Sequence, residues 1–136
     1  MLEIVEAINY DPVRMIAKPG VLFEPGNLVR VIEDEDGNTI CDLANGSIWA
    51  MGIAGNECCA EDGSYRLQNM VEVWSQKMIF RTDLYEDDTK FSPGCPLYVS
   101  ENGLFTSKPE NEDTPCVAHV TMVPDHKHEY FEASWL

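Results

Sequence analysis

Turn-forming residues divide this 136-residue chain into short apolar runs. Pro-Gly pairs stand at 19–20, 25–26 and 93–94, and glycine also follows acidic or amide residues at 36–38 and 101–103. The signals recur about every 8 to 12 residues, and hardly any segment shows an apolar stripe of helical period. We therefore predict an all-β fold, a small single-domain β-barrel or β-sandwich of roughly nine or ten short strands.

Two reversals predict hairpins between strands that are neighbours in sequence. The runs 28–32 and 39–43 flank Glu33-Asp34-Glu35-Asp36-Gly37-Asn38, and the runs 97–99 and 104–106 flank Ser100-Glu101-Asn102-Gly103. Glycine supplies the positive φ that such tight reversals need. Each pair of runs is therefore expected to lie side by side in a sheet.

Further strands are expected along the rest of the chain. An apolar run at 48–54 predicts a buried strand, 71–81 one long strand interrupted by a bulge, and 116–123 another strand. In the last eight residues Phe131, Ala133 and Trp135 alternate with polar side chains, which is typical of a half-buried strand. The segment 56–68 is expected to be a polar loop.

The first eleven residues carry apolar side chains among acidic ones, and Pro12 closes the segment. The apolar residues are Leu2, Ile4, Val5, Ile8 and Tyr10. Their mixed periodicity does not decide between a helical turn, an edge strand packed on its own domain and an extended arm. We divide the chain into an N-terminal arm, 1–11, and a single β-rich domain, 12–136.

The chain is strongly acidic. Aspartate and glutamate number 24 against 9 lysines and arginines, which gives a formal charge of −15. This charge repels phosphate backbones and anionic membrane surfaces, so we expect neither nucleic acid nor membrane as a partner. The acidic residues either form a well-solvated surface or favour a basic or mixed-charge partner.

The five cysteines, an odd number, are expected to be free thiols. No segment resembles a secretory leader, and no apolar run approaches the roughly 20 residues that span a bilayer. We therefore expect synthesis in a reducing cytoplasm and a soluble protein.

Three histidines are the candidates for metal chemistry. His126 and His128 could share one face of a strand and, with His119 and Glu129 or Glu132, form a ligand set; a solvated turn is the alternative. Cys116 and His119 lie three residues apart on an expected strand, so their side chains should point to opposite faces and not pair. We expect no enzymatic activity and no cofactor.

Three segments are similar to parts of a known protein family. They are KPGVLFEPGNLVRV, FSPGCPLYVSENGLFTS and PCVAHVTMVPDHKHEYFEASWL. In order and spacing these segments resemble the decoration proteins, also called head cement proteins, of tailed bacteriophages. The likeness includes Gly-x-Pro-Leu-Tyr-Val at 94–99, Gly-Leu-x-Thr at 103–106 and Val-Ala-x-Val at 117–120.

The resemblance implies a structural virion protein, made in the host cytoplasm, that binds the outside of an assembled phage head and stabilises it. Its partner would be the major capsid protein, and a trimer on the shell is the favoured oligomer. The apolar residues of 1–11 are then the candidate docking residues. The alternatives are a cupin-like metal- or small-molecule-binding β-barrel using the three histidines, and an adaptor of the phage tail.

Overall fold

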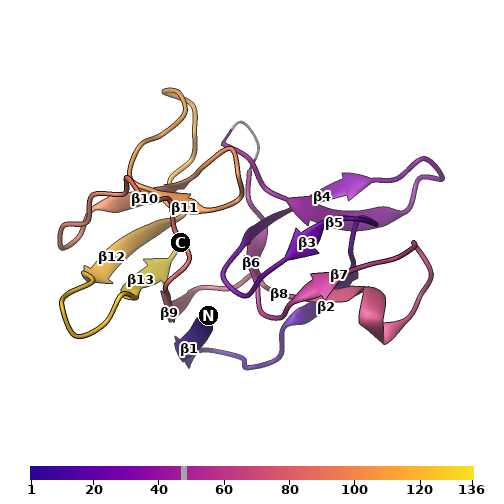
Figure 1. The fold of residues 1–136 in the computed structure, drawn as a ribbon, viewed down its shortest axis with the longest axis horizontal. Helices are drawn as coiled ribbons and strands as arrows, with labels where there is room; N and C mark the ends of the chain where they lie inside the picture. The colour runs from indigo at the N-terminus through magenta and orange to yellow at the C-terminus, as the bar shows by residue number, and fades with distance from the viewer. Residues whose placement is uncertain (47–48) are drawn as a thin grey trace.

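The computed structural model describes residues 1–46 and 49–136, which form three antiparallel sheets. The predicted all-β class is confirmed, and a sandwich-like arrangement fits the three sheets (Figure 1). None of these sheets of the described residues closes into a barrel. The described residues contain thirteen strands, more than predicted, because several are two or three residues long. Ile48, predicted to begin a strand, lies outside the described residues.

Each sheet combines strands that are distant in sequence. The six-stranded sheet has the order β1 (Leu2–Ala7), β9 (Met78–Thr82), β13 (Phe131–Trp135), β12 (Ala118–Met122), β10 (Pro96–Val99) and β11 (Phe105–Thr106). The five-stranded sheet has the order β2 (Val13–Ile16), β8 (Met70–Trp74), β6 (Gly52–Ala54), β4 (Leu28–Glu33) and β5 (Thr39–Leu43). β3 (Leu22–Phe23) pairs with β7 (Cys58–Cys59), and a 3-10 turn, η1, covers Leu67–Asn69.

Both predicted hairpins are confirmed. β4 and β5 pair from Val29 opposite Leu43 to Glu33 opposite Thr39. At their tip, the Asp34 carboxylate accepts the backbone N–H groups of Asp36 and Asn38 at 2.9 and 2.8 Å. The β10–β11 reversal is closed by a hydrogen bond from the backbone N–H of Leu104 to the Ser100 hydroxyl and by Gly103, at φ +71°.

The prediction that residues 71–81 form one long strand is wrong. It is divided between β8 in the five-stranded sheet and β9 in the six-stranded sheet, separated by residues 75–77. β2 pairs with β8 and β1 pairs with β9, so two adjacent chain segments cross together from one sheet to the other. The Gln76 side chain joins the two crossings: its Oε1 accepts the Asn9 backbone N–H at 3.0 Å, and its Nε2 donates to the Asn9 carbonyl.

The expected loop 56–68 also contains a strand. Cys58 and Cys59 form β7, which pairs with Phe23 and Leu22 of β3. The short run offered no alternation from which a two-residue strand could be recognised.

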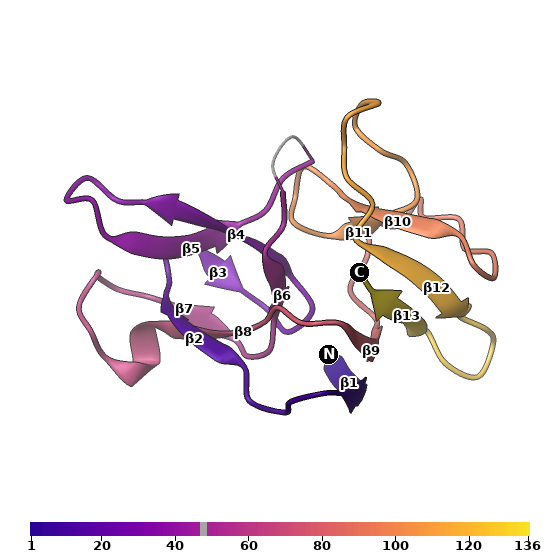
Figure 2. The ribbon, with the colours of Figure 1, turned by 180° about the vertical axis from the view of Figure 1, so that it is seen from behind.

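Two buried clusters fill the molecule. The aromatic core, centred on Phe80, Phe105, Phe131 and Trp135, lies mainly on the six-stranded sheet and reaches Leu28 and Ile53 of the other sheet. The small-residue core lies in the five-stranded half and consists of Ala17, Phe23, Val29, Cys41, Ala54, Cys58, Ala60, Val71 and Val73. Figures 1 and 2 show the two halves side by side, with both crossings between them.

Candidate docking surface

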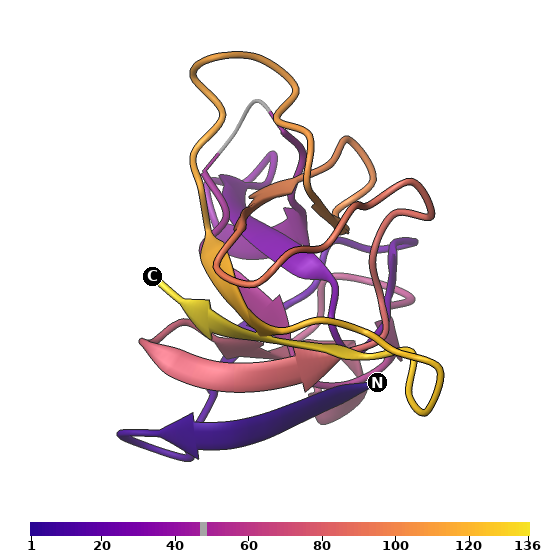
Figure 3. The same ribbon diagram turned by 90° about the vertical axis from the view of Figure 1, so that its left-hand side faces the viewer.

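β1 is an outer strand of the six-stranded sheet, as predicted by one of the alternatives for residues 1–11. It pairs with β9 on one side, and among the described residues no strand pairs with its other side. Figure 3 shows β1 at the margin of the layer formed with β9 and β13. At the opposite margin, β11 is partly covered, because Phe105 forms a bridge with Tyr85 and its carbonyl accepts the Glu86 N–H at 2.9 Å. An unpaired edge presents backbone groups that another chain can bind.

The predicted docking residues separate into two kinds. Leu2 and Ile4 are half-buried and pack against the aromatic core, so they hold β1 on its sheet. Val5 lies in a β-bulge between Ile4 and Glu6, where it is partly exposed. Ile8 and Tyr10 follow β1 and are exposed. Docking by any of these residues stays a prediction, but the last three are the ones whose side chains are accessible.

Three of the exposed apolar side chains lie where the chain crosses between the sheets. Ile8 is 90% exposed, Tyr10 59% and Val13, the first residue of β2, 48%. We call these three residues the crossover patch. Val13 was not among the predicted docking residues, because in sequence it begins an ordinary strand; its exposure follows from the position of β2 at the outer edge of the five-stranded sheet.

Two hollows flank Ile8. One, of about 470 Å³, is lined by Ala7, Ile8, Met78, Ile79 and polar neighbours; the other, of about 320 Å³, is lined by Val13, Val73, Gln76 and neighbours of Ile8. Both are shallow and lie along the crossing rather than within a core. A partner side chain placed there would contact apolar surface next to an unpaired strand edge.

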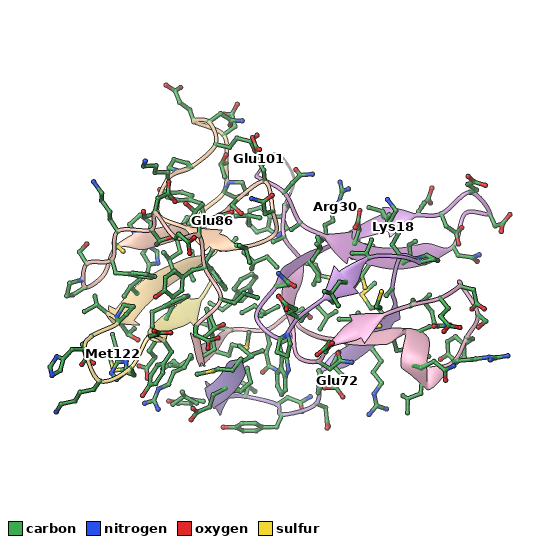
Figure 4. All side chains as sticks on the ribbon, viewed as in Figure 1. Lys18, Arg30, Glu72, Glu86, Glu101 and Met122 are labelled. Atoms are coloured by element: carbon green, nitrogen blue, oxygen red, sulfur yellow. The ribbon has the colours of Figure 1, made fainter. Side chains whose placement is uncertain are left out.

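Charges around the patch are of both signs, because exposed Lys77 lines the larger of the two hollows. Glu6 and Asp11 are exposed on either side of Ile8. Glu3 lies 3.7 Å from Arg81, which also bonds Glu132 at 3.0 Å, so this cation is already paired on the outer face of the sheet. Arg14 lies 3.9 Å from Glu72, which is labelled in Figure 4. The patch therefore presents apolar side chains among charges of both signs.

The three histidines are not brought together as a ligand set. Within residues 1–46 and 49–136 no group of three or more histidine, cysteine, aspartate or glutamate side chains has a geometry that could hold a metal ion. His128 instead stacks on Tyr130 with ring centroids 4.1 Å apart and lies 3.5 Å from Asp125. His126 is exposed in the turn, and His119 is exposed on β12.

The expectation that Cys116 and His119 cannot pair is wrong. The Cys116 Sγ lies 3.9 Å from the His119 Nε2. The reasoning assumed a strand from residue 116, but β12 begins at Ala118, so the alternation of faces does not extend to Cys116. Cys116 is half-buried, and its thiol donates to the Ala118 carbonyl oxygen at 3.4 Å.

All five cysteines are free thiols, as predicted. Burial raises the pKa of the Cys41 thiol to about 12, with a further contribution from nearby Cys58. Burial likewise raises the pKa of Cys58, whose Sγ lies 3.5 Å from the Gln68 carbonyl. Both are packed in the small-residue core, where they behave as small apolar side chains.

Carboxylates gather around a third hollow, of about 310 Å³, beside the β10–β11 reversal. Glu86 and Glu101, labelled in Figure 4, line it together with Glu110. Partial desolvation raises the pKa of Glu110, and a hydrogen bond with Glu101 and the charge of that residue raise it further. The Asn102 side chain donates to Glu86 at 2.9 Å, which fixes one wall of the hollow.

Comparison with known proteins does not identify a function for this surface. No protein-family model matches the chain, and no curated protein matches its sequence. Among the described residues, no helix combines the length and apolar character needed to cross a membrane.

Proposed function

We propose that the protein is a structural, non-enzymatic decoration protein that binds the outside of an assembled tailed-phage head and stabilises the shell. The observation that carries the proposal is the unpaired edge of β1, which continues directly into the exposed crossover patch. The sequence resemblance indicates a phage head as the assembly. The unpaired edge of β1 and the exposed apolar residues beside it are a surface suited to binding another protein. The partner is the major capsid protein.

The proposed binding combines two physical contributions. A strand or extended segment of the capsid protein can bond to the unpaired backbone groups of β1, which gives affinity without a deep pocket. Apolar side chains of the shell can cover Ile8, Tyr10 and Val13, which are exposed in the isolated protein. The formal charge of −15 keeps free copies soluble before they dock.

The finer features of the resemblance belong to the same proposal. A trimer on the shell would place several copies of this edge around one capsid position, which multiplies weak contacts. The predicted barrel would apply to the five-stranded sheet. Its outer strands are β2 and β5, and Ala17, which follows β2, forms a bridge with Cys41 of β5.

The two alternative functions, a tail adaptor and a cupin-like metal site, would require different features of the molecule. An adaptor of the phage tail would use the same edge and patch, so only the location of the protein in the particle separates it from a head protein. A cupin-like metal site needs ligands that converge, and the described histidines do not. We therefore place the tail adaptor second.

The first test is density-gradient sedimentation of lysate from the source culture, with mass spectrometry of each fraction. The proposal expects the protein in DNA-filled particles, in many copies per particle. Recovery at the top of the gradient alone would overturn it, and cross-linking to tail proteins within the particles would favour the adaptor.

The second test addresses the surface. Replacing Ile8 and Tyr10 with serine removes exposed apolar side chains that support neither core, so folding should be unchanged. We expect affinity for undecorated heads to fall about 100-fold, the effect of losing two interface anchors. The matched control replaces Leu67 and Tyr65 with serine. These residues are 71% and 87% exposed and lie at and just before η1, outside the crossover patch. Equal loss in both variants, or none in the first, would contradict the assignment of the patch.

Deletion of residues 1–11 is a less specific test than the serine variants. If these residues were only an arm, the truncated protein would fold and lose binding. In the structure, deletion also removes the packing of Leu2 and Ile4 on the aromatic core and uncovers β9. Lost binding would then report lost stability as well as lost contacts, which the serine variants avoid.

A further inference from the structure

Cys116 and His119 form a thiol–imidazole pair at the start of β12. The Cys116 thiol donates to the Ala118 carbonyl oxygen at 3.4 Å, and its Sγ also lies 3.9 Å from the His119 Nε2, within reach of a weak sulfur hydrogen bond. His119 is exposed and Cys116 is half-buried, so small molecules can approach the pair from solvent. A neighbouring imidazole promotes reaction of a thiol because it accepts the thiol proton and stabilises the thiolate that results.

The other four thiols have different surroundings. Cys41 and Cys58 are buried in the small-residue core, and burial raises the pKa of both. Cys59 is exposed, and Cys95 is half-buried and accepts the backbone N–H of Ser92 at 3.5 Å. Among the residues that the structure describes, none of these four thiols has a hydrogen bond to a histidine. Accessibility and a proton acceptor therefore coincide at Cys116.

We propose that Cys116 is a modification site that exchanges with low-molecular-weight disulfides, with His119 as its proton acceptor. In this step the Cys116 S–H turns from the Ala118 carbonyl oxygen to the His119 Nε2 and gives up its proton there. The thiolate then attacks one sulfur of the small disulfide. A new S–S bond forms on Cys116 as the original S–S bond breaks. The departing thiolate takes up a proton, from His119 or from water, so the disulfide supplies the oxidation and no other reactant is needed.

The experiment uses the full chain with oxidised glutathione in excess near neutral pH. Peptide mass spectrometry follows the occupancy of each cysteine with time. We expect Cys116 to be modified first, and His119→Gln to lower its initial rate roughly tenfold. This is less than the ~100-fold that an aligned general base contributes, because the pair is separated by 3.9 Å.

Two internal controls separate a local effect from a change in folding. The rate at exposed Cys59 should be the same in His119→Gln as in the parent protein, and Thr121→Val, on the exposed side of β12, should leave Cys116 unchanged. Modification of Cys59 or Cys95 ahead of Cys116 would overturn the proposal. An unchanged Cys116 rate in His119→Gln would overturn it equally. Neither result depends on whether the protein binds phage heads.

Discussion

The six-stranded half packs around large aromatic rings, whereas the five-stranded half packs mainly around alanine, valine and cysteine. In the aromatic core the ring centroids of Phe80, Phe105 and Phe131 lie 5.3 to 6.0 Å apart, so a few side chains account for much of the buried area. Within the five-stranded sheet, neighbouring backbones approach closely: a Cβ on Gly52 of β6 would lie 2.3 Å from the Trp74 carbonyl oxygen of β8. One half should be sensitive to truncation and the other to added bulk.

Removing a central ring should have the largest effect. Phe80 is fully buried and contacts Phe105, Phe131 and Trp135, so Phe80→Ala should lower the free energy of unfolding by about 3 to 5 kcal/mol. Val71→Ala, equally buried in the small-residue core, should cost about 2 kcal/mol. Urea unfolding followed by fluorescence and circular dichroism measures both. Equal costs would remove the contrast between the cores, and non-coincident transitions would show that the halves unfold separately.

A glycine at the junction of the halves provides the next test. Gly26, at φ +105°, approaches the other half so closely that a Cβ would lie 2.5 Å from the Thr82 Oγ1. Gly26→Ala combines backbone strain with this clash and should cost about 3 kcal/mol. Gly20, at φ +80° with no atom within 4 Å of its Cβ position, is the matched control and should cost about 1 kcal/mol. Similar losses in thermal unfolding would mean that the junction contact contributes nothing.

The contributions of two carboxylates to the stability of the fold should depend on pH in opposite directions. We expect these effects to be smaller than those of the substitutions above. In the five-stranded half, backbone N–H groups led by that of Asn38 lower the pKa of Asp34 below its ordinary 3.8. In the six-stranded half, partial desolvation and the neighbouring Glu101 raise the pKa of Glu110 above its ordinary 4.5. Ionised Asp34 therefore stabilises the fold above about pH 4 and loses this contribution on acidification, whereas Glu110 favours the fold when protonated and loses this contribution as the pH rises through its folded pKa.

Thermal unfolding at several pH values tests this difference. Asp34→Asn should lower the melting temperature at neutral pH, and this difference should shrink as the pH falls below 3.8, the ordinary pKa of the group. Glu110→Gln should raise the melting temperature at neutral pH, and the gain should disappear on acidification, when Glu110 itself is protonated. The same direction of change in both variants would contradict the assigned environments.

The parts of the fold that the sequence predicted well are local. The hairpins around residues 33–38 and 100–103 need only a reversal and two flanking strands, both encoded within about fifteen residues. The division of 71–81 between two sheets depends on β1 and β2, which lie far away in the chain and have weak periodicity of their own. The closeness of Cys116 to His119 depends on where β12 starts, and strand boundaries are poorly encoded.

The candidate surface was predictable to a similar extent. Ile8 and Tyr10 could be named because apolar side chains among acidic ones in a short terminal segment are unusual. Their exposure, the burial of Leu2 and Ile4, and the contribution of Val13 follow from pairing with strands some 60 to 80 residues away. Only the folded arrangement separates side chains that attach β1 to its sheet from those that remain available to a partner.

The pairing of the first residues with distant strands has a consequence for biosynthesis. The Thr82 hydroxyl donates to the Met1 carbonyl across 81 residues of chain, and β2 pairs with β8. During translation, the first two strands leave the ribosome long before their partners exist, so they cannot take their final places until more than half of the chain has been made. Until then their apolar residues are available to chaperones and to other nascent chains. The edge that we assign to docking is thus also the part of the molecule that waits longest to fold.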